Sequence, residues 1–267
     1  MMYNKLLHEL GDWENALHYE SLPVNSRLDS LIQSHILLTG EHQSLSEKPW
    51  YILPDNSAHL IFYLLKRGNA FSSEIRLIGP RTKHKIISRK GRCLTFLTSF
   101  KPGGLSLVLG KGIREFVDNA VDATSLFDVG ADIQEKLFND AMIGDKYSLK
   151  ERIENLLLRK MINAQANLSP AVSEFLKNRC KGIHRVSEVA DLIGISERRL
   201  RTIVNETIGH SPKLVLQIQR FSHLLELSNQ TKDWSSMAYD SGYYDQSHMI
   251  ADFQRMVEIS PEKLFDT

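Results

Sequence analysis

The stretch Val186-Ser-Glu-Val-Ala-Asp-Leu-Ile-Gly-Ile-Ser196 decides how the C-terminal part of this chain folds, because its pattern recurs about 48 residues later. The second copy reads Ser236-Met-Ala-Tyr-Asp-Ser-Gly-Tyr-Tyr-Asp-Gln-Ser-His248, and the copies close on Ser211-Pro212 and Ser260-Pro261. In both, an alanine stands four residues before a glycine. The small alanine lets two helices approach closely, and the glycine gives the backbone freedom for the tight turn between them. We therefore predict two helix-turn-helix units, at about 186–206 and 236–256, which favour DNA binding over catalysis.

The composition is that of a soluble globular protein with two modest domains. The chain has 267 residues, of which 42% are hydrophobic and 24% charged. No stretch approaches the roughly 20 apolar residues of a membrane span, and the segment 1–10 lacks the apolar core of a signal peptide. Cys93 and Cys180 fall in different predicted domains without metal-ligand spacing. We expect a cytoplasmic, reduced protein with no membrane partner.

The charge of the C-terminal part is low for a nucleic-acid binder. The whole chain has a formal net charge of +1, but from Ile183 onward nine Lys and Arg stand against twelve Asp and Glu. Three of the arginines, Arg198, Arg199 and Arg201, gather on one predicted helix. Because the distribution of charge matters more than its total, DNA binding remains the favoured reading, with weak non-specific affinity.

The pattern changes from strands to helices along the chain, which indicates an α+β protein with two domains. Short apolar runs separated by Pro, Gly, Asn and Asp predict a small N-terminal β-barrel with flanking helices. These strand candidates are 35–39, 58–65, 74–78, 93–97 and 105–109, and the expected helices that follow are 132–141 and 149–161. A short helix is also expected near the N-terminus. The polar break at 163–168 and the helix start at Ser169-Pro170 place the boundary between domains 1–165 and 166–267.

The helix that follows the first turn carries the residues best suited to read DNA. Ser196 is its expected N-cap, and Leu200, Ile203 and Val204 form its expected buried face. Arginine suits guanine, asparagine suits adenine, and threonine suits either bases or backbone. The candidate DNA-binding residues of this helix are Arg198, Arg199, Arg201, Thr202 and Asn205. The competing reading is an ordinary solvated helix face.

A long helix from Lys213 to about Ser228 is predicted to connect the two units. At 1.5 Å per residue it spans roughly 25 Å, which could bring two recognition helices near the roughly 34 Å repeat of B-DNA, so that one monomer reads adjacent major grooves. The helix 245–256 is the second recognition candidate, with Asp245 as its cap. Its candidate contacts are Gln246, Ser247, His248 and Ile250. His248 and Asp245 have no third partner at metal-ligand spacing, so no catalytic or metal role is assigned to them.

These motifs closely resemble the DNA-binding part of AraC/XylS-type transcription regulators. The resemblance covers about 170–267 and is carried by Gly242-Tyr-Tyr-Asp-Gln-Ser-His248, Phe253-Gln-Arg255 and Ile259-Ser-Pro261, and by Ile195-Ser196, Gly209-His-Ser-Pro212 and Arg220. It implies two recognition helices joined by a long helix, sequence-specific binding to double-stranded promoter DNA, contact with RNA polymerase and activation. Thr202 and Ala251 stand where the family often has arginine, so the second helix is expected to grip phosphates more than to read bases.

The N-terminal part resembles, more weakly, the cupin-like regulatory domain of a subgroup of that family. Leu53-Pro-Asp-Asn56, Ile78-Gly-Pro-Arg-Thr82 and Phe100-Lys-Pro-Gly-Gly104 carry this resemblance. It implies a small-molecule effector or a homodimer. We expect no metal, because only the isolated His59 and His84 are present, and no cofactor. A barrel filled by its own side chains is the alternative to an effector site.

No catalytic constellation is readable in the sequence, so an enzyme is not expected. The segment Gly104 to Lys111 departs from a phosphate-binding loop, because five residues separate its glycines and Gly112 follows the lysine where Ser or Thr is required. The alternative function is a ligand-sensing or dimeric scaffold module with weakened DNA binding, which the acidic balance supports.

Overall fold

A computed structural model describes residues 18–40, 50–87, 91–161, 168–177, 185–228 and 233–261. In the N-terminal half, the described strands form an antiparallel sheet with the order β1-β2-β7-β4-β5-β8 and a second sheet in which β3 pairs with β6. The strands are β1 (His18–Leu22), β2 (Ile32–Thr39), β3 (Trp50–Ile52), β4 (His59–Arg67), β5 (Ala70–Ile78), β6 (Lys85–Ile87), β7 (Arg92–Phe100) and β8 (Ala120–Asp122).

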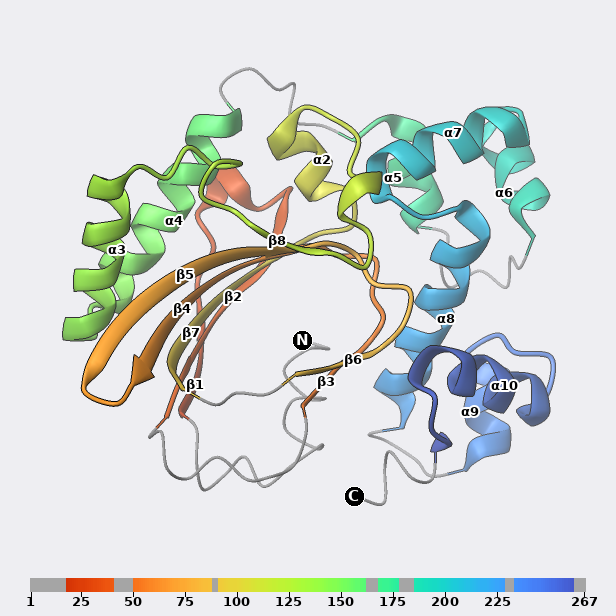
Figure 1. Cartoon of the computed structure of the whole chain (residues 1–267). Helices are drawn as coiled ribbons and strands as arrows, with labels where there is room; N and C mark the ends of the chain where they lie inside the picture. The colour runs from red at the N-terminus through yellow and green to blue at the C-terminus, as the bar shows by residue number, and fades with distance from the viewer. Residues whose placement is uncertain are drawn as a thin grey trace.

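The central strand β4 is apolar on both faces because both faces of the large sheet are covered. Leu60, Phe62 and Leu64 point to the face that packs against helices α3 (Ala131–Ile143) and α4 (Lys146–Lys160). The alternate residues, 61, 63 and 65, belong to a second apolar cluster on the opposite face, which Ile52 of β3 joins. The small sheet lies on the side of the large sheet opposite α3 and α4 (Figure 1).

The strands of the small sheet, β3 and β6, continue the β4–β5 hairpin of the large sheet beyond a bend. His59 pairs with Ile78 in the β4–β5 ladder, the isolated bridge 55–81 comes next, and Ile52 pairs with Lys85. Pro54 and Pro80 lie at the interruption, where they cannot donate a ladder hydrogen bond. The hairpin folds back there. The N-terminal half predicted as a small β-barrel with flanking helices is confirmed as β-rich, with its described strands in a six-stranded and a two-stranded sheet.

One predicted strand is wrong, because residues 105–109 are helical. Helix α2 (Gly104–Leu109) follows the turn at 101–103, and Leu105 and Val108, three positions apart, are its buried side chains. An apolar run of this length does not distinguish a strand from a buried helical turn by periodicity. Gly104 fits this helix because a Cβ there would lie 2.4 Å from the carbonyl oxygen of Leu31. The predicted N-terminal helix, the break at 163–167 and Cys180 lie outside the described residues.

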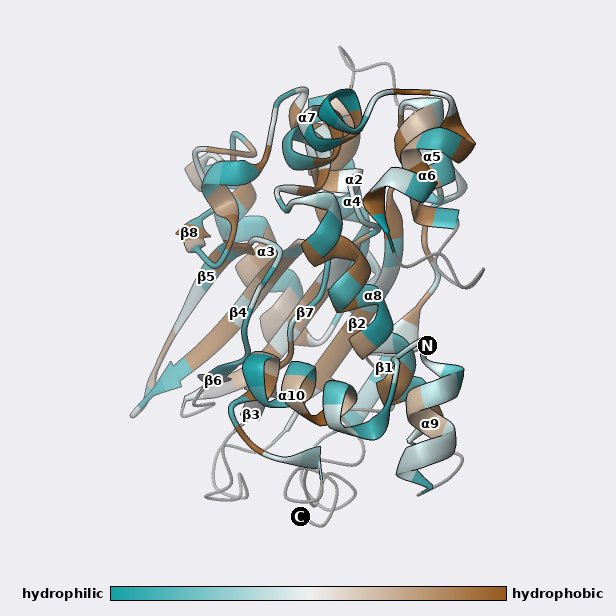
Figure 2. Cartoon of the chain, turned by 90° about the vertical axis from the view of Figure 1, so that its right-hand side faces the viewer, coloured by the Kyte–Doolittle hydropathy of each residue, from teal (hydrophilic) through white to brown (hydrophobic). Residues whose placement is uncertain are grey.

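The C-terminal half is helical throughout its described ranges. Its helices are α5 (Pro170–Lys177), α6 (Val186–Ile193), α7 (Glu197–Ile208), α8 (Pro212–Leu227), α9 (Trp234–Asp240) and α10 (Gln246–Val257). The first turns of α8 pack into an apolar core with α5, α6 and α7, and its later turns pack into a second core with α9 and α10. Figure 2 shows these two groups at opposite ends of α8. The predicted connector is thus confirmed as the shared helix of both units.

Both groups of C-terminal helices are held against the N-terminal half. The backbone N–H of Ile113 donates to the carbonyl of Glu206 at the end of α7 (3.1 Å), and the N–H of His84 donates to the carbonyl of Met256 at the end of α10 (2.9 Å). Between them, the amide nitrogen of Asn56 donates to the carbonyl of Val215 on α8 (3.2 Å). The last turns of α7 and α10 are therefore each fixed by a backbone hydrogen bond from the other half of the chain.

Candidate nucleic-acid interface

The first helix-turn-helix unit has the geometry that its sequence predicts. Ala190 is 1% exposed where α6 meets its neighbours, and Gly194 has a φ of +75°, which suits glycine. The turn closes with a hydrogen bond from the N–H of Ile195 to the carbonyl of Ala190 (3.0 Å). The Ser196 hydroxyl then accepts from the N–H of Arg199 (3.2 Å), which makes Ser196 the N-cap of α7.

The second unit repeats this arrangement at the equivalent positions. Gly242 has a φ of +78°, and the N–H of Tyr243 donates to the carbonyl of Ala238 (2.9 Å). Asp245 caps α10 by accepting from the N–H of His248 (2.7 Å), so the predicted capping role of Asp245 is confirmed. Helix α9 begins at Trp234, two residues before the predicted start.

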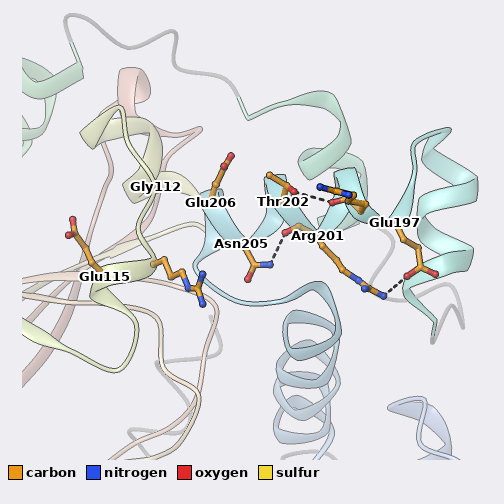
Figure 3. A pocket seen from close by; sticks show the side chains of 9 residues that line it. Gly112, Glu115, Glu197, Arg201, Thr202, Asn205 and Glu206 are labelled. Carbon is orange, nitrogen blue, oxygen red and sulfur yellow. Dashed lines mark hydrogen bonds and ion pairs between the residues drawn. The ribbon is translucent and has the colours of Figure 1, made fainter.

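The outer face of α7 is polar and lies in an open groove of about 900 Å³ (Figure 3). The inner residues Leu200 and Val204 are 0% exposed, which leaves the opposite side of the helix to solvent. Four of the predicted contacts, Arg198, Arg201, Thr202 and Asn205, line this groove together.

Three side chains of this groove have hydrogen-bond or ion-pair partners within α7 itself. Arg201 is paired with Glu197 at 2.6 Å, and the pair lies at the surface. Thr202 Oγ1 donates to the carbonyl of Arg198 (3.1 Å), and Asn205 Nδ2 donates to the carbonyl of Arg201 (2.8 Å). Exposed pairs and single hydrogen bonds of this kind stabilise by little, so each group can exchange its partner for a base edge at small cost.

Arg199 does not join the other predicted contacts of α7. Its side chain lines a separate open groove with the apolar residues Leu192, Ile195 and Ile203 of the same unit. The two grooves lie on different sides of α7, because residues one position apart on a helix point in different directions. The three arginines that are close in the sequence therefore lie on two sides of α7, with Arg198 and Arg201 in one groove and Arg199 in the other.

The predicted contacts of α10 are less exposed than those of α7. Ser247 is exposed, whereas Gln246 is half-buried and its Oε1 accepts from the hydroxyl of Ser235 (3.3 Å). The ring of His248 stands edge-on to that of Tyr243 at 5.4 Å. Ile250 was expected to face outward, but it is half-buried and packs against the second apolar core.

Asp252 organises the charges of the second unit. It is 0% exposed, and its carboxylate lies 2.6 Å from Arg255 and 3.6 Å from Arg220 of α8. The Arg220 guanidinium also lies 5.2 Å from the centre of the Tyr243 ring. Burial and, second, the nearby Asp252 charge raise the pKa of Tyr243 above its ordinary value. The cations of this unit are therefore directed at a buried carboxylate, a feature that the sequence pattern does not reveal.

The groove beside α7 has a second wall from the N-terminal half. Gly112, Arg114 and Glu115 line it next to the C-terminal end of α7. Figure 3 shows the segment with Gly112 and Glu115 at the end of the helix that carries Glu206. The sequence alone does not single out Arg114, because its proximity to α7 depends on packing between segments distant in the chain.

The described residues show neither a metal site nor a membrane-spanning helix. No group of three or more His, Cys, Asp or Glu there could hold a metal ion. His59 Nδ1 is hydrogen-bonded to Ser99 Oγ (3.1 Å) and its Nε2 to Asp55 (3.0 Å). Ser99 is only 3% exposed, so these hydrogen bonds connect neighbouring strands and do not form an accessible catalytic triad. In the described ranges, no helix has both the length and the hydropathy of a membrane span.

Comparison with known families agrees with the geometry of the two units. Residues 189–267 match the model of a helix-turn-helix domain. The C-terminal part of the chain is an AraC-type helix-turn-helix domain. This domain agrees with the resemblance of the C-terminal motifs. Residues 20–122 match a second model, described as a domain of unknown function (DUF6597).

Solved structures with a similar fold include those of ToxT from Vibrio cholerae. The structure from strain O395 is 12% identical, with a TM-score of 0.42, over 81% of this chain and 92% of that one. A 1.65 Å structure of ToxT is 11% identical, with a TM-score of 0.43, over 94% of this chain and 98% of that one. ToxT from strain SCE256 with a bound unsaturated fatty acid is 12% identical, with a TM-score of 0.41, over 81% and 93% of the two chains. No curated protein sequence matches the chain.

Proposed function

We propose that the protein is a sequence-specific transcription regulator in which α7 enters the major groove and reads base edges. The observation that carries this proposal is the polar outer face of α7, where Arg198, Arg201, Thr202 and Asn205 line one groove in the second helix of a helix-turn-helix unit. Such a helix contacts bases mainly through its N-terminal residues, and three of the four, Arg198, Arg201 and Thr202, lie in its first two turns.

The four residues have different roles in this proposal. Arg198 and Arg201 present bidentate donors that match guanine, and Asn205 matches adenine. Thr202 contacts a base or the backbone. Arg201 leaves Glu197 on binding, which costs little because the pair is exposed.

The second unit is proposed to lie in the adjacent major groove and to position the protein. Helix α8 has 16 residues, a length of about 24 Å at 1.5 Å per residue, which brings α10 near the next turn of the duplex. Ser247 and His248 are proposed to approach the backbone together with Gln246, and Ile250 supports the helix from inside. Activation, contact with RNA polymerase, a small effector in the N-terminal half and a homodimer are supported by the family resemblance alone.

The double variant Arg198→Ala/Arg201→Ala tests the reading role of α7. Target DNA is selected from a random pool with the intact protein, and affinities are compared for this DNA and a scrambled duplex. Each bidentate arginine contributes about 1–3 kcal/mol of discrimination, so the preference should fall by at least about tenfold.

Arg199→Ala is the matched control for this experiment. It removes the same charge from the same helix but on the side of the other groove, so it should retain the preference. Circular dichroism confirms that each variant is folded. A folded double variant that discriminates as well as the intact protein contradicts the assignment of α7.

The second candidate function is a ligand-sensing or dimeric scaffold module with weakened DNA binding. The described range 233–261 favours it, because Arg255 there is opposed by five acidic residues: Asp233, Asp240, Asp245, Asp252 and Glu258. A protein that binds no duplex at low salt, yet is stabilised by a metabolite in a thermal-shift screen, supports this alternative. Binding of duplex DNA that weakens as salt rises supports the regulator.

A further inference from the structure

We propose that Arg114 of the N-terminal half contacts the DNA backbone beside the major groove that α7 enters. The proposal rests on the proposed function of α7 and extends its DNA-binding surface beyond the helix-turn-helix domain. Arg114 begins the 3-10 turn Arg114–Phe116 and lines the same groove as Arg198, Arg201 and Asn205.

The segment that carries Arg114 is fixed against α7. The side chains of Ile113 and Phe116, 1% and 6% exposed, are anchored in the N-terminal core. The N–H of Ile113 donates to the carbonyl of Glu206, and a Cβ built on Gly112 would lie 3.5 Å from that same oxygen. Arg114 stands between these anchors with an exposed side chain, so its position relative to α7 is set before DNA arrives.

The dimensions of a helix in DNA place phosphates next to this segment. A helix with its side chains is about 10–12 Å across, and the major groove is about 12 Å wide. The two phosphate backbones therefore run along the flanks of an inserted helix. Because the Arg114 segment lies at the C-terminal end of α7 and lines the same groove as its outer face, it faces the backbone that this end of the helix approaches.

The charges of the groove leave Arg114 available for a phosphate. Glu115, the glutamate next to Arg114 in the chain, is already paired with Lys111 at 2.7 Å. Within the described residues, Arg114 has no ion pair at 4.0 Å or less. An arginine is well suited to this role because its planar guanidinium can donate two parallel hydrogen bonds to phosphate oxygens.

Arg114→Ala tests the proposal in the full-length protein, with affinities for selected and scrambled duplexes measured over a range of salt concentrations. We expect both affinities to fall by a similar factor, on the order of fivefold near 0.1 M salt. The slope of log affinity against log salt should become shallower by about 0.9, which is the signature of one lost phosphate contact. Sequence preference should stay unchanged, unlike that of the α7 double variant.

Arg67→Ala provides the control, because it removes the same charge from the exposed β4–β5 hairpin tip, on the side of the molecule away from α7 (Figure 1).

Glu115→Gln should strengthen DNA binding, because it removes a negative charge near the DNA backbone and frees Lys111. Equal affinities and salt slopes for Arg114→Ala and Arg67→Ala overturn the proposal, and tighter binding by Arg114→Ala shows that the segment obstructs DNA. If the intact protein binds no duplex at low salt, the proposed function itself fails.

Discussion

His35 shows how a single buried side chain connects the sheet to its covering helices. Its Nδ1 is hydrogen-bonded to Thr98 Oγ1 (2.9 Å) and its Nε2 to Glu154 of α4 (3.2 Å). Glu154 also accepts from the backbone N–H of Asn25 and from Lys150, both at 2.8 Å. All of these contacts are made inside the N-terminal half, where a buried polar group is costly unless it is satisfied.

This environment predicts a pH-dependent stability. Burial, the dominant cause, lowers the pKa of His35 from 6.5 to about 4, although the Glu154 charge acts in the opposite direction. A folded-state pKa below the unfolded one means that the unfolded chain takes up the proton first as the pH falls. The free energy of unfolding should therefore keep its full value above pH 6.5. It should decrease by about 3 kcal/mol as the pH falls from 6.5 to 4.

The measurement is urea unfolding at a series of pH values, with His35→Gln as the comparison. The amide can keep hydrogen bonds to Thr98 and Glu154 but does not titrate, so the curve of the variant should be flatter over this interval. His210 also has a pKa lowered by burial and remains in both proteins, so the difference between the curves isolates His35. Curves of equal slope would refute the assignment.

At the scale of elements, the two recognition helices differ in charge more than in geometry. Both are capped by a polar side chain and follow a glycine turn, yet α7 carries three arginines and α10 carries only Arg255, which is paired with Asp252. A helix whose cation faces a buried carboxylate contributes little to the phosphate attraction that dominates DNA affinity.

A pair of α10 variants tests this difference. Gln246→Ala should change the affinity for selected DNA by less than about threefold, because Gln246 is half-buried and hydrogen-bonded to Ser235. Ala251→Arg adds an exposed cation to the helix and should strengthen binding several-fold, with a salt slope steeper by about 0.9. A large loss of sequence preference in Gln246→Ala would instead make α10 a reading helix. No gain from Ala251→Arg would place that face away from the duplex.

Local signals explain which elements the sequence predicts. The turns at Gly194 and Gly242 and the caps Ser196 and Asp245 depend on residues a few positions apart, so the helical units could be located closely. Helix α2 is not predicted because its five-residue apolar run is too short to show either the strand or the helix period. The strands β1, β3, β6 and β8 were missed because three to five residues carry too little alternation to mark a strand.

The missing parts of the candidate site are those created by packing. Arg199 could not be separated from Arg198 by composition, and the Asp252 cluster needs Arg220 from another helix. Arg114 comes to α7 only because the two halves dock. Such contacts join positions far apart in the chain, and one sequence contains no periodicity that reports them.

At the scale of the whole molecule, Gly209 is a point where the two halves meet closely. It ends α7 with a φ of +87°, and a Cβ there would lie 2.6 Å from Cγ2 of Val117. Gly194 has a similar φ of +75°, but nothing lies within 4 Å of its Cβ position. Comparing the same substitution at the two glycines therefore separates the effect of backbone strain from the effect of contact between the halves.

Alanine at each glycine gives the corresponding prediction. Gly194→Ala should lower the free energy of unfolding by about 1 kcal/mol through strain alone, and Gly209→Ala by about 2–3 kcal/mol, because overpacking adds to the strain. Adding Val117→Ala to Gly209→Ala should recover part of the excess cost. Equal costs at the two glycines, or no recovery, would mean that the halves adjust freely at this contact.

The backbone amides of Ile113 and His84, both in the N-terminal half, can be used to follow the positions of α7 and α10. Each amide proton is held by the last turn of one recognition helix. A displacement of α7 would expose the Ile113 amide, and a displacement of α10 would expose that of His84. Deuterium uptake at these two positions therefore follows each helix separately, through a part of the chain outside the helix-turn-helix domain itself.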